Sequence, residues 1–398
     1  MADAAGGELD SARGWLVVAL GFVSLVLVWG TIFTFTVYAG ELAGAFGLSR
    51  LAVSSVFSVT TAAFFVAGGG AGVVIARLPL RPVLAAAGVA IGASVALLQV
   101  VGSYAGLVAA FGLLGVAGGT VFVVVISLVP QWFDAYEGRA MGVTMTGNGL
   151  GVLVLPVVWV RLLGRVDVRT AFVVVGGAAV AVVLAASLVY RRPAGVDPGR
   201  VAVDGDWFRG HLADRRFLVA LVGYPLLWSW YFVLSSSLVD VLTAAGIART
   251  VAATAFGTIG GISILTRLAS GAVADRFGAR ETLAVGVGLA ALGVLALVVT
   301  DTRALMYVTL AVFGVGLGAV ATLFSPILVG RFGPENATAI VGLFTVAEAT
   351  TAFGAPIVVN LLVGATGGYA VPLALLALLT LAGAGLFHWG TGPVDAGG

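Results

Sequence analysis

Residues 104–128 read YAGLVAAFGLLGVAGGTVFVVVISL, and no charged side chain occurs anywhere in this run. A helix of that length rises about 38 Å, whereas the hydrocarbon core of a bilayer is about 30 Å thick. Only helices and closed barrels satisfy all backbone polar groups in lipid. The run is therefore predicted to cross a membrane as a helix.

More apolar runs of similar length lie on both sides of this one. They cover residues 15–40, 51–76, 82–101, 139–162, 169–190, 217–242, 248–274, 281–300, 304–328, 337–363 and 368–389. The chain is 60% hydrophobic and only 10% charged, whereas an ordinary soluble domain carries roughly 25% charged residues. This composition excludes a soluble globular enzyme and predicts an all-α membrane protein with twelve transmembrane helices.

A polar, arginine-rich stretch separates the first six runs from the last six. We therefore expect an N-terminal six-helix bundle at 1–190 with a short N-terminal tail, a cytoplasmic central loop at 191–216 and a C-terminal six-helix bundle at 217–398. With both termini inside, 13 arginines fall in inner segments and 6 in outer ones, as the positive-inside rule requires. This predicts a multi-pass protein of the cell membrane with cytoplasmic termini.

The two halves of the chain repeat with an offset of 199 residues. Residues 47–50 (GLSR) return as residues 246–249 (GIAR). Glu41 and Asp240 are equivalent, and each stands nine residues before an arginine, so we expect structural ion pairs at these helix rims. Parallel repeats of six spans are typical of transporters, which bind their cargo near the bilayer midplane.

The residue types that are missing exclude several kinds of chemistry. All 20 basic residues are arginine, and there is no cysteine. Without lysine there is no Schiff base with retinal or pyridoxal phosphate, and no phosphate-binding lysine of an ATPase. His211 and His388 lie far apart in the sequence, so no metal site is expected. We expect a monomer in the lipid bilayer, with no cofactor and no nucleic-acid partner.

Residues 271–280 read GAVADRFGAR, which resembles the GxxxDRxGxR loop of the major facilitator superfamily. The resemblance implies the major facilitator fold, two six-helix bundles, and a loop that gates the conformational change. The first-half copy has Ala76 and Pro79 in place of the Asp and the Gly. The gating candidates are Asp275, Arg276, Arg280 and, in the first half, Arg77. The alternative is that the loop only anchors and caps a helix on the cytoplasmic side.

Within that superfamily the chain resembles the monocarboxylate and oxalate/formate transporters. The similarity is carried by residues 132–142, by residues 342–348 (GLFTVAE) and by Arg267, which stands where both branches keep an arginine. Animal monocarboxylate carriers also have an Asp and a Lys where this chain has Ser263 and Phe33. Their arrangement for handling protons and trapping substrate is therefore incomplete here.

Arg267 can also be judged without the family. An arginine within a span is costly and almost always faces the bundle interior or a water-filled cavity. Ser263, Arg267 and Ser270 share one helical face, so we predict that this face lines a polar cavity. A guanidinium can hold a carboxylate by two parallel hydrogen bonds. Substrate binding is the favoured role, and a structural ion pair with Glu348 is the alternative.

Glu348 is the only carboxylate in the middle of an apolar run. It matches the monocarboxylate branch, because the oxalate-type relatives carry a lysine there. Burial and a nearby arginine act on a carboxyl group in opposite directions, so a change in the partner of Arg267 would move a proton. We predict that Glu348 couples transport to protons. The alternative is a permanently ionised group that neutralises Arg267.

Four further residues are candidates for substrate binding. Trp228 and Tyr231 belong to an aromatic stripe in the seventh run, and helix packing is the alternative for this stripe. Thr34 lies on a polar face of the first run, and Asn148 is the most polar neutral residue of the fifth.

These features predict secondary transport of a small organic anion. The favoured function is proton-coupled symport of a monocarboxylate by alternating access. The alternatives are an organic-anion exchanger of the oxalate/formate type and an efflux pump for another small molecule. Glu348 disfavours a dianion, because it removes one positive charge from the site.

Overall fold

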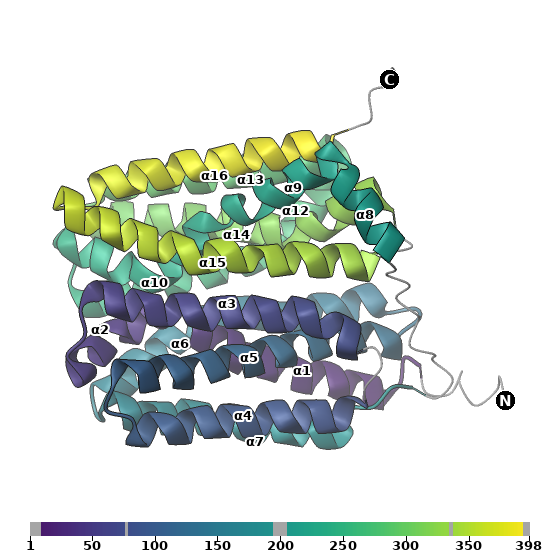
Figure 1. Cartoon of the computed structure of the whole chain (residues 1–398), viewed down its shortest axis with the longest axis horizontal. Helices are drawn as coiled ribbons and strands as arrows, with labels where there is room; N and C mark the ends of the chain where they lie inside the picture. Colours follow the sequence, from purple (N-terminus) through teal and green to yellow (C-terminus); the bar gives the residue numbers. More distant parts are fainter. Residues whose placement is uncertain (1–8, 76–78, 194–204, 334–336, 393–398) are drawn as a thin grey trace. The chain divides into compact units, whose positions relative to one another are not determined.

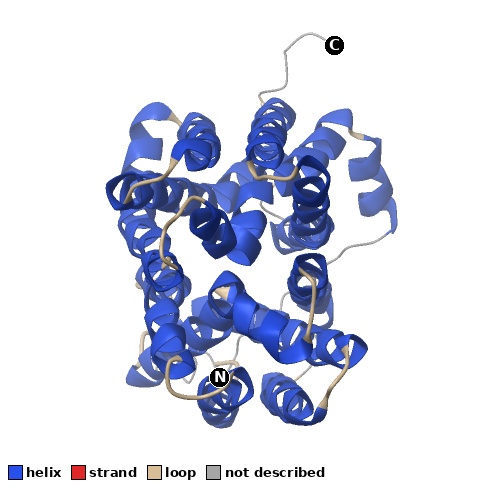
Figure 2. Cartoon of the chain, turned by 90° about the vertical axis from the view of Figure 1, so that its left-hand side faces the viewer, coloured by secondary structure: helices blue, strands red, loops and turns tan. Residues whose placement is uncertain are grey.

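The structure is a computed structural model that describes residues 9–75, 79–193, 205–333 and 337–392. Every regular element in these ranges is a helix (Figure 1, Figure 2). Within them, 12 segments are long and apolar enough to cross a membrane, which confirms the predicted fold class. The chain divides into two compact units, Met1–Arg200 and Val201–Gly398.

The first unit contains six spans. They are α1 (Ala12–Phe33) with α2 (Phe35–Phe46), α3 (Arg50–Ile75), α4 (Leu80–Val100), α5 (Tyr104–Leu128) with η2 (Val129–Trp132), α6 (Glu137–Leu163) and α7 (Val168–Val189). The side chains of Ser11, Ser103 and Asp167 accept backbone N–H groups at the starts of α1, α5 and α7. Such caps satisfy donors that the first turn of a helix leaves free.

The second unit begins with a short helix, α8 (Gly205–Ala213), which lies inside the predicted central stretch. Six spans follow: α9 (Arg215–Leu227) with α10 (Ser229–Ala244), α11 (Arg249–Ala255) with α12 (Gly257–Phe277), α13 (Ala279–Ala296) with η3 (Leu297–Val299), α14 (Arg303–Phe332), α15 (Ala337–Thr366) and α16 (Ala370–Gly390). Asp214 and Thr302 cap the starts of α9 and α14.

The sequence repeat has a counterpart in the backbone. Gly47 and Gly246, 199 residues apart, follow the first span of their units with positive φ angles of 61° and 88°. Glycine is the residue that adopts this conformation without strain. The same offset therefore relates both the sequence and the helix ends of the two units.

Pairs of glycines four residues apart bring the second and fourth spans of each unit into close contact. A Cβ at any of these glycines would lie closer than 3.0 Å to a backbone carbonyl oxygen of the facing helix. The pairs, with the residues whose carbonyls they meet, are Gly115 with Thr60 and Gly119 with Phe64 in the first unit, and Gly314 with Ile259 and Gly318 with Ser263 in the second. Each pair matches its counterpart at the 199-residue offset. Small residues at this spacing let membrane helices approach closely.

Among the described residues, three spans are broken into two helices. The breaks lie at Thr34, Trp228 and Phe256. At the first break, the Tyr38 hydroxyl donates to the Thr31 carbonyl at 2.8 Å. Pro225 lies three residues before the second break and has no N–H to donate. Discontinuous helices of this kind surround the cargo site in many transporters.

Candidate functional site

Arg267 lies on α12, and its Nε atom is buried without a hydrogen-bond partner within the described residues. α14 fixes the backbone at this point, because a Cβ at Gly318 would lie 3.0 Å from the Arg267 nitrogen. On the same face, Ser263 is buried, and its hydroxyl donates to the Gly260 carbonyl at 2.8 Å. The close contact of α12 with α14 therefore fixes the backbone of Arg267. The Nε–H group of Arg267 remains available as a hydrogen-bond donor.

Glu348 lies on α15 and is only 6% exposed. The Tyr224 hydroxyl of α9 donates a hydrogen bond to its carboxylate. The Tyr224 ring is buried and stacks on Phe324, with the ring centroids 5.4 Å apart. It also contacts Phe344 and Phe387 at 5.6 and 5.7 Å. The partner of Glu348 is thus a fixed aromatic hydroxyl on the seventh span.

Trp228 and Tyr231 continue the stripe that begins at Tyr224. Trp228 lies at the break between α9 and α10, with its ring 5.8 Å from that of Tyr231. Its indole approaches the Tyr224 hydroxyl, but Nε1 makes no well-formed hydrogen bond within the described part of the chain. Tyr231 lies within electrostatic range of Arg267. The aromatic stripe therefore begins at Tyr224, which contacts Glu348, and continues to Tyr231, which interacts with Arg267.

Arg267 and Glu348 do not pair with one another among the described side chains. α15 packs against α9, α10, α14 and α16, whereas α12 packs against α11, α13 and α14. The direct ion pair that the sequence left open is therefore not formed in this structure. Tyr224 takes the place of Arg267 as the partner of Glu348.

Asn148 and Thr34 belong to the first unit, and both are buried. The Thr34 hydroxyl donates to the Gly30 carbonyl at 2.6 Å, so its proton is used within the first span. Asn148 is 2% exposed, and its Oδ1 has no hydrogen-bond partner in the described ranges. Gly147 and Gly151, on either side of Asn148, bring α6 against the backbone of α1. A role for either residue in binding stays a prediction.

The two histidines lie apart from Arg267 and Glu348 in the sequence. The His211 ring packs on Phe217 with centroids 5.1 Å apart, and His388 lies in the last turn of α16. Among the described residues, no three His, Asp or Glu side chains gather closely enough to hold a metal ion. The arrangement offers hydrogen bonds, one guanidinium and one buried carboxyl group.

Comparison with known proteins gives the family. The model of the Major Facilitator Superfamily matches residues 18–356 and, in a second match, residues 231–396. The chain belongs to the Major Facilitator Superfamily. It is a multi-pass membrane transporter.

Several transporters of the superfamily are similar to this chain at low identity. The oxalate:formate antiporter of Oxalobacter formigenes is 26% identical over 84% of this chain and 82% of its own length. Monocarboxylate transporter 13 of Rattus norvegicus is 25% identical over 95% of this chain and 89% of its own. The MFS transporter asaE of Aspergillus flavus is 27% identical, but this match covers only 55% of the chain and 49% of that protein.

A solved structure shares the fold. It is a bacterial homolog of the human lysosomal transporter Spinster, in an inward-facing and unoccupied conformation. The TM-score is 0.75, with 96% of this chain and 98% of that chain covered and 15% identity.

The superfamily loop at 271–280 joins α12 to α13. Gly278 adopts a φ of 95°, which explains why a glycine stands there. The Arg280 guanidinium donates to the His388 carbonyl at the end of α16. Arg280 thus ties the loop to the last helix of the same unit.

The other gating candidates are Asp275 and Arg276 on α12 and Arg77 of the first-half copy. Asp275 and Arg276 are exposed near the end of α12, and the Arg276 guanidinium lies over the Phe277 ring at 5.4 Å. Arg77 of the first-half copy lies outside the described residues. The gating role of the loop remains a prediction.

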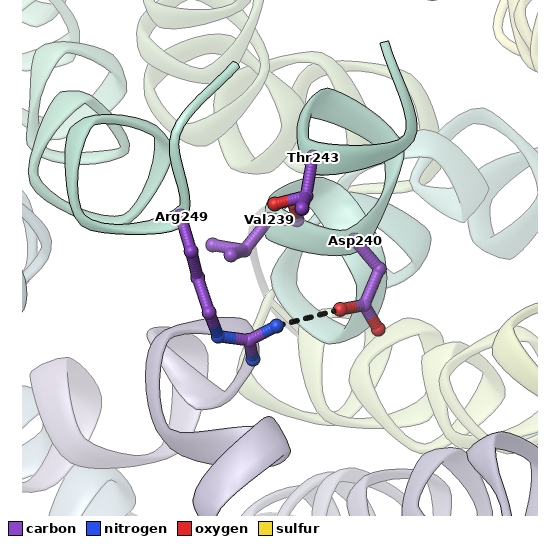
Figure 3. A network of polar contacts seen from close by, with 4 residues as sticks. All are labelled: Val239, Asp240, Thr243 and Arg249. Carbon is purple, nitrogen blue, oxygen red and sulfur yellow. Dashed lines mark hydrogen bonds and ion pairs between the residues drawn. The ribbon is translucent and has the colours of Figure 1, made fainter. Parts of the chain in front are cut away.

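The expected rim ion pair of the second unit is present. The Arg249 Nη1 atom lies 3.2 Å from the Asp240 Oδ1 atom. This ion pair, drawn as a dashed line in Figure 3, joins the start of α11 to the end of α10. Their side chains are 39% and 27% exposed. A pair this open contributes about 1 kcal/mol or less to stability, so its effect is to support the turn between α10 and α11.

Sequence reasoning missed two polar contacts that fix the seventh span. Ser229 shares a hydrogen bond with Thr380 at 3.1 Å, between α10 and α16. The Asn360 amide of α15 donates to the Ser237 hydroxyl of α10 at 3.2 Å. An asparagine within an apolar run was a visible signal, since a buried amide needs partners. Serine and threonine gave none, because they can bond to their own helix.

Proposed function

We propose that the protein is a secondary transporter that moves a small organic monocarboxylate together with a proton, by alternating access. The observation that carries the proposal is the state of Arg267. Its guanidinium stands within a span, its Nε is buried, and no carboxylate pairs with it among the described residues. An anionic cargo would supply the partner that this guanidinium needs.

The physical argument rests on the cost of a charge within a membrane. An unpaired arginine at this depth costs at least about 3 kcal/mol. It is retained where it serves function, and a guanidinium presents two parallel N–H groups that match a carboxylate. The rigid contact of α12 with α14 would keep this fork in place while the cargo binds.

Glu348 supplies the proton-coupling step in this proposal. A protonated Glu348 and a bound anion on Arg267 together leave the site with the charge of its empty, ionised form. The loaded carrier therefore crosses between its two conformations without moving net charge in the site. The buried position of Glu348 supports this role, because a carboxyl group away from water can exist in either form only with defined partners.

We further propose the cell membrane as the site of action, with cytoplasmic termini, a monomeric carrier, and the 271–280 loop as the gate. The inner position of this loop follows from the arginine distribution. A gate at the end of α12 would act on the helix that carries Arg267.

Exchange of organic anions is the second candidate. It is favoured by the similarity to the oxalate:formate antiporter, which extends over 84% of this chain. The carboxyl group of Glu348 argues against a dianion, because it leaves the site with one positive charge less. Efflux of an uncharged compound is not favoured, because it would leave Arg267 without a partner.

Uptake into proteoliposomes tests the proposal. Labelled lactate, pyruvate, acetate, formate and oxalate are offered with and without an inward proton gradient. We expect a monocarboxylate to accumulate when only the pH difference is imposed, and to stop doing so when a proton ionophore is added. Uptake that needs an internal anion and ignores pH would identify an exchanger. Absence of uptake of every carboxylate would refute both candidates.

A further inference from the structure

Two arginines lie against an exposed indole ring at one end of the second unit. The guanidinium carbons of Arg215 and Arg216, at the start of α9, are 5.6 and 5.3 Å from the centroid of the Trp389 ring. Trp389 stands in the last turn of α16 and is 45% exposed, and Arg215 is exposed as well. An aromatic ring attracts a guanidinium but carries no net negative charge. These three residues, which we call the α9–α16 cluster, therefore hold two positive charges that the ring does not neutralise.

Two more arginines approach the same end of α16. The Arg280 guanidinium donates to the His388 carbonyl, and the Arg331 Nε atom donates to the Gly392 carbonyl at 3.0 Å. A Cβ at Gly392 would lie 3.3 Å from Arg216 Nη1 and 3.4 Å from Arg280 Nη2, so these guanidinium groups are close neighbours. Carbonyls at a helix end need donors and attract cations, which explains the bonds to α16. The gathering of positive charge at this helix end favours a bound anion.

The carboxylates that the structure describes do not balance the exposed arginine. The Asp214 side chain accepts the Arg216 backbone N–H at 2.8 Å and so serves as the cap of α9. Among the side chains that the structure describes, no carboxylate forms an ion pair with Arg215. The fold does not require charge here, because at the 199-residue offset Leu16 and Val17 of the first unit are the equivalents of Arg215 and Arg216.

Exposed apolar side chains continue from the cluster along both helices. On α9, Leu218 and Val222 follow Arg215 at spacings of three and four residues and are 38% and 55% exposed. On α16, Leu386 precedes Trp389 by three residues and is 37% exposed. Residues at these spacings share one face of a helix. The positive charges thus stand at the end of an apolar surface on each helix.

The two apolar surfaces adjoin. α9 packs against α16 along its length (Figure 1). Their backbones are closest beside the cluster, where a Cβ at Gly390 would lie 2.6 Å from the Ala220 nitrogen. The arginines and the indole are therefore held together by the packing of the two helices.

We propose that the α9–α16 cluster binds the head group of a phospholipid with a net negative charge, whose acyl chains lie along Leu218, Val222 and Leu386. A guanidinium matches the oxygens of a phosphate group, and an indole at a helix end is suited to the membrane interface. With the cytoplasmic termini proposed above, this end of the unit faces the leaflet that carries anionic lipids. The adjoining apolar surface distinguishes a lipid from a soluble anion, which would use the arginines alone.

Native mass spectrometry of the purified full-length protein tests the proposal without any transport measurement. Phosphatidylglycerol and phosphatidylcholine with the same acyl chains are titrated, and the dissociation constant of the first bound lipid is measured. We expect wild type to prefer phosphatidylglycerol and Arg215→Gln to weaken its binding about fivefold, the effect of one basic residue near an anionic surface. Binding of phosphatidylcholine should not change. Arg161→Gln, which removes an exposed arginine at the end of α6, is the matched control and should alter neither constant.

Equal affinity of wild type for the two lipids would overturn the proposal, as would an equal effect of Arg215→Gln and Arg161→Gln. Glycerol 3-phosphate in large excess should not displace phosphatidylglycerol, and displacement would identify a site for small anions instead of a lipid site. If Arg215→Gln does not accumulate, wild type supplies the second test. Its preference for phosphatidylglycerol should shrink as ammonium acetate is raised, because salt screens exposed charges, and a preference that ignores salt would contradict the assignment.

Discussion

An arginine within a membrane span persists only if its donors are used in some state of the protein. In this structure the Arg267 Nε has no partner among the described residues, although its helix is locked against α14. A structural arginine would instead be paired, because an unsatisfied charge at this depth is costly. We therefore propose that the partner is the carboxylate of the cargo.

Replacing Arg267 by glutamine should abolish transport without unfolding the protein. We expect uptake of the carboxylate to fall by about a hundredfold, the effect of losing two charge-assisted hydrogen bonds. The melting temperature of the purified protein should stay nearly unchanged, since Arg267 forms no ion pair with the described residues. Arg267→Lys is the matched control, and it should retain part of the activity because it keeps the charge but not the fork. Loss of protein from the membrane, with normal transport by what remains, would make Arg267 structural.

Replacing Glu348 by glutamine should separate binding from coupling. The neutral amide of the introduced glutamine mimics the protonated carboxyl group, so the variant should still bind cargo and exchange labelled for unlabelled substrate. It should lose the acceleration by an inward proton gradient, because no group then takes up and releases the proton. Uptake with and without a pH difference measures this. Accumulation driven by the pH difference alone would show that the proton is carried by another group.

At this scale the sequence revealed the charged residues but not their partners. Arg267 and Glu348 stand out because a charge in an apolar run has few structural reasons to be there. The bond between Tyr224 and Glu348 could not be foreseen, because α9 and α15 are distant in sequence and an aromatic residue in a span usually only packs. The alternative of a direct ion pair between Arg267 and Glu348 is not realised in this structure, in which α15 packs against α9, α10, α14 and α16.

At the scale of helices, the contact between α12 and α14 sets the position of Arg267. Gly314 and Gly318 let α14 lie against the backbone of α12, from Ile259 to Arg267. The same arrangement joins α5 to α3, where no arginine is present at the equivalent position. The close contact is thus a feature of the fold, and the second unit uses it to hold a charged side chain.

A methyl group at Gly318 should displace Arg267. A Cβ there would lie 2.6 Å from the Thr266 Cβ and 2.8 Å from the Ser263 carbonyl oxygen, so Gly318→Ala must push α12 away from α14. Overpacking of this kind costs about 1–3 kcal/mol. We expect a lower melting temperature and a raised KM.

Gly330→Ala in the same helix is the matched control, because a Cβ at that position meets nothing within 4 Å. It should change neither quantity. Equal effects of the two substitutions would mean that the contact of Gly318 with α12 does not position Arg267.

The spans were predictable as elements, whereas their breaks were not. Length and apolar composition define a span whatever its internal geometry. The break at Trp228 follows Pro225, which is a visible signal, but the break at Thr34 has no proline before it. There the chain is stabilised by the Tyr38 hydroxyl, which bonds to the Thr31 carbonyl. A side-chain bond of this kind depends on the folded geometry and leaves no trace in composition.

At the scale of the whole molecule, the two units share a fold and differ in chemistry. The repeat aligns helix ends and glycine contacts, and this much could be derived from the sequence. The two charged groups in the middle of the spans both belong to the second unit, since Arg267 is equivalent to Gly68 at the 199-residue offset and Glu348 to Asn148 at the 200-residue offset. The two units thus share the scaffold of helices and glycine contacts, whereas these two charged side chains stand in the second unit alone.

The loop of the second unit should control the rate of the conformational change and leave binding untouched. Asp275 is exposed near the end of α12, eight residues beyond Arg267, so its side chain is far from any cargo that Arg267 holds. Arg280 fixes the other end of the loop to α16. We expect Asp275→Asn to lower the maximal rate of exchange several-fold while KM changes less than about twofold, as measured by uptake over a range of substrate concentrations. Asp301→Asn makes the same change in an exposed loop at the opposite end of α13, and it should have no effect on either quantity. A large rise of KM with an unchanged maximal rate in Asp275→Asn would contradict the gating role, because a gate biases the two conformations of the carrier without altering how tightly the site holds its cargo.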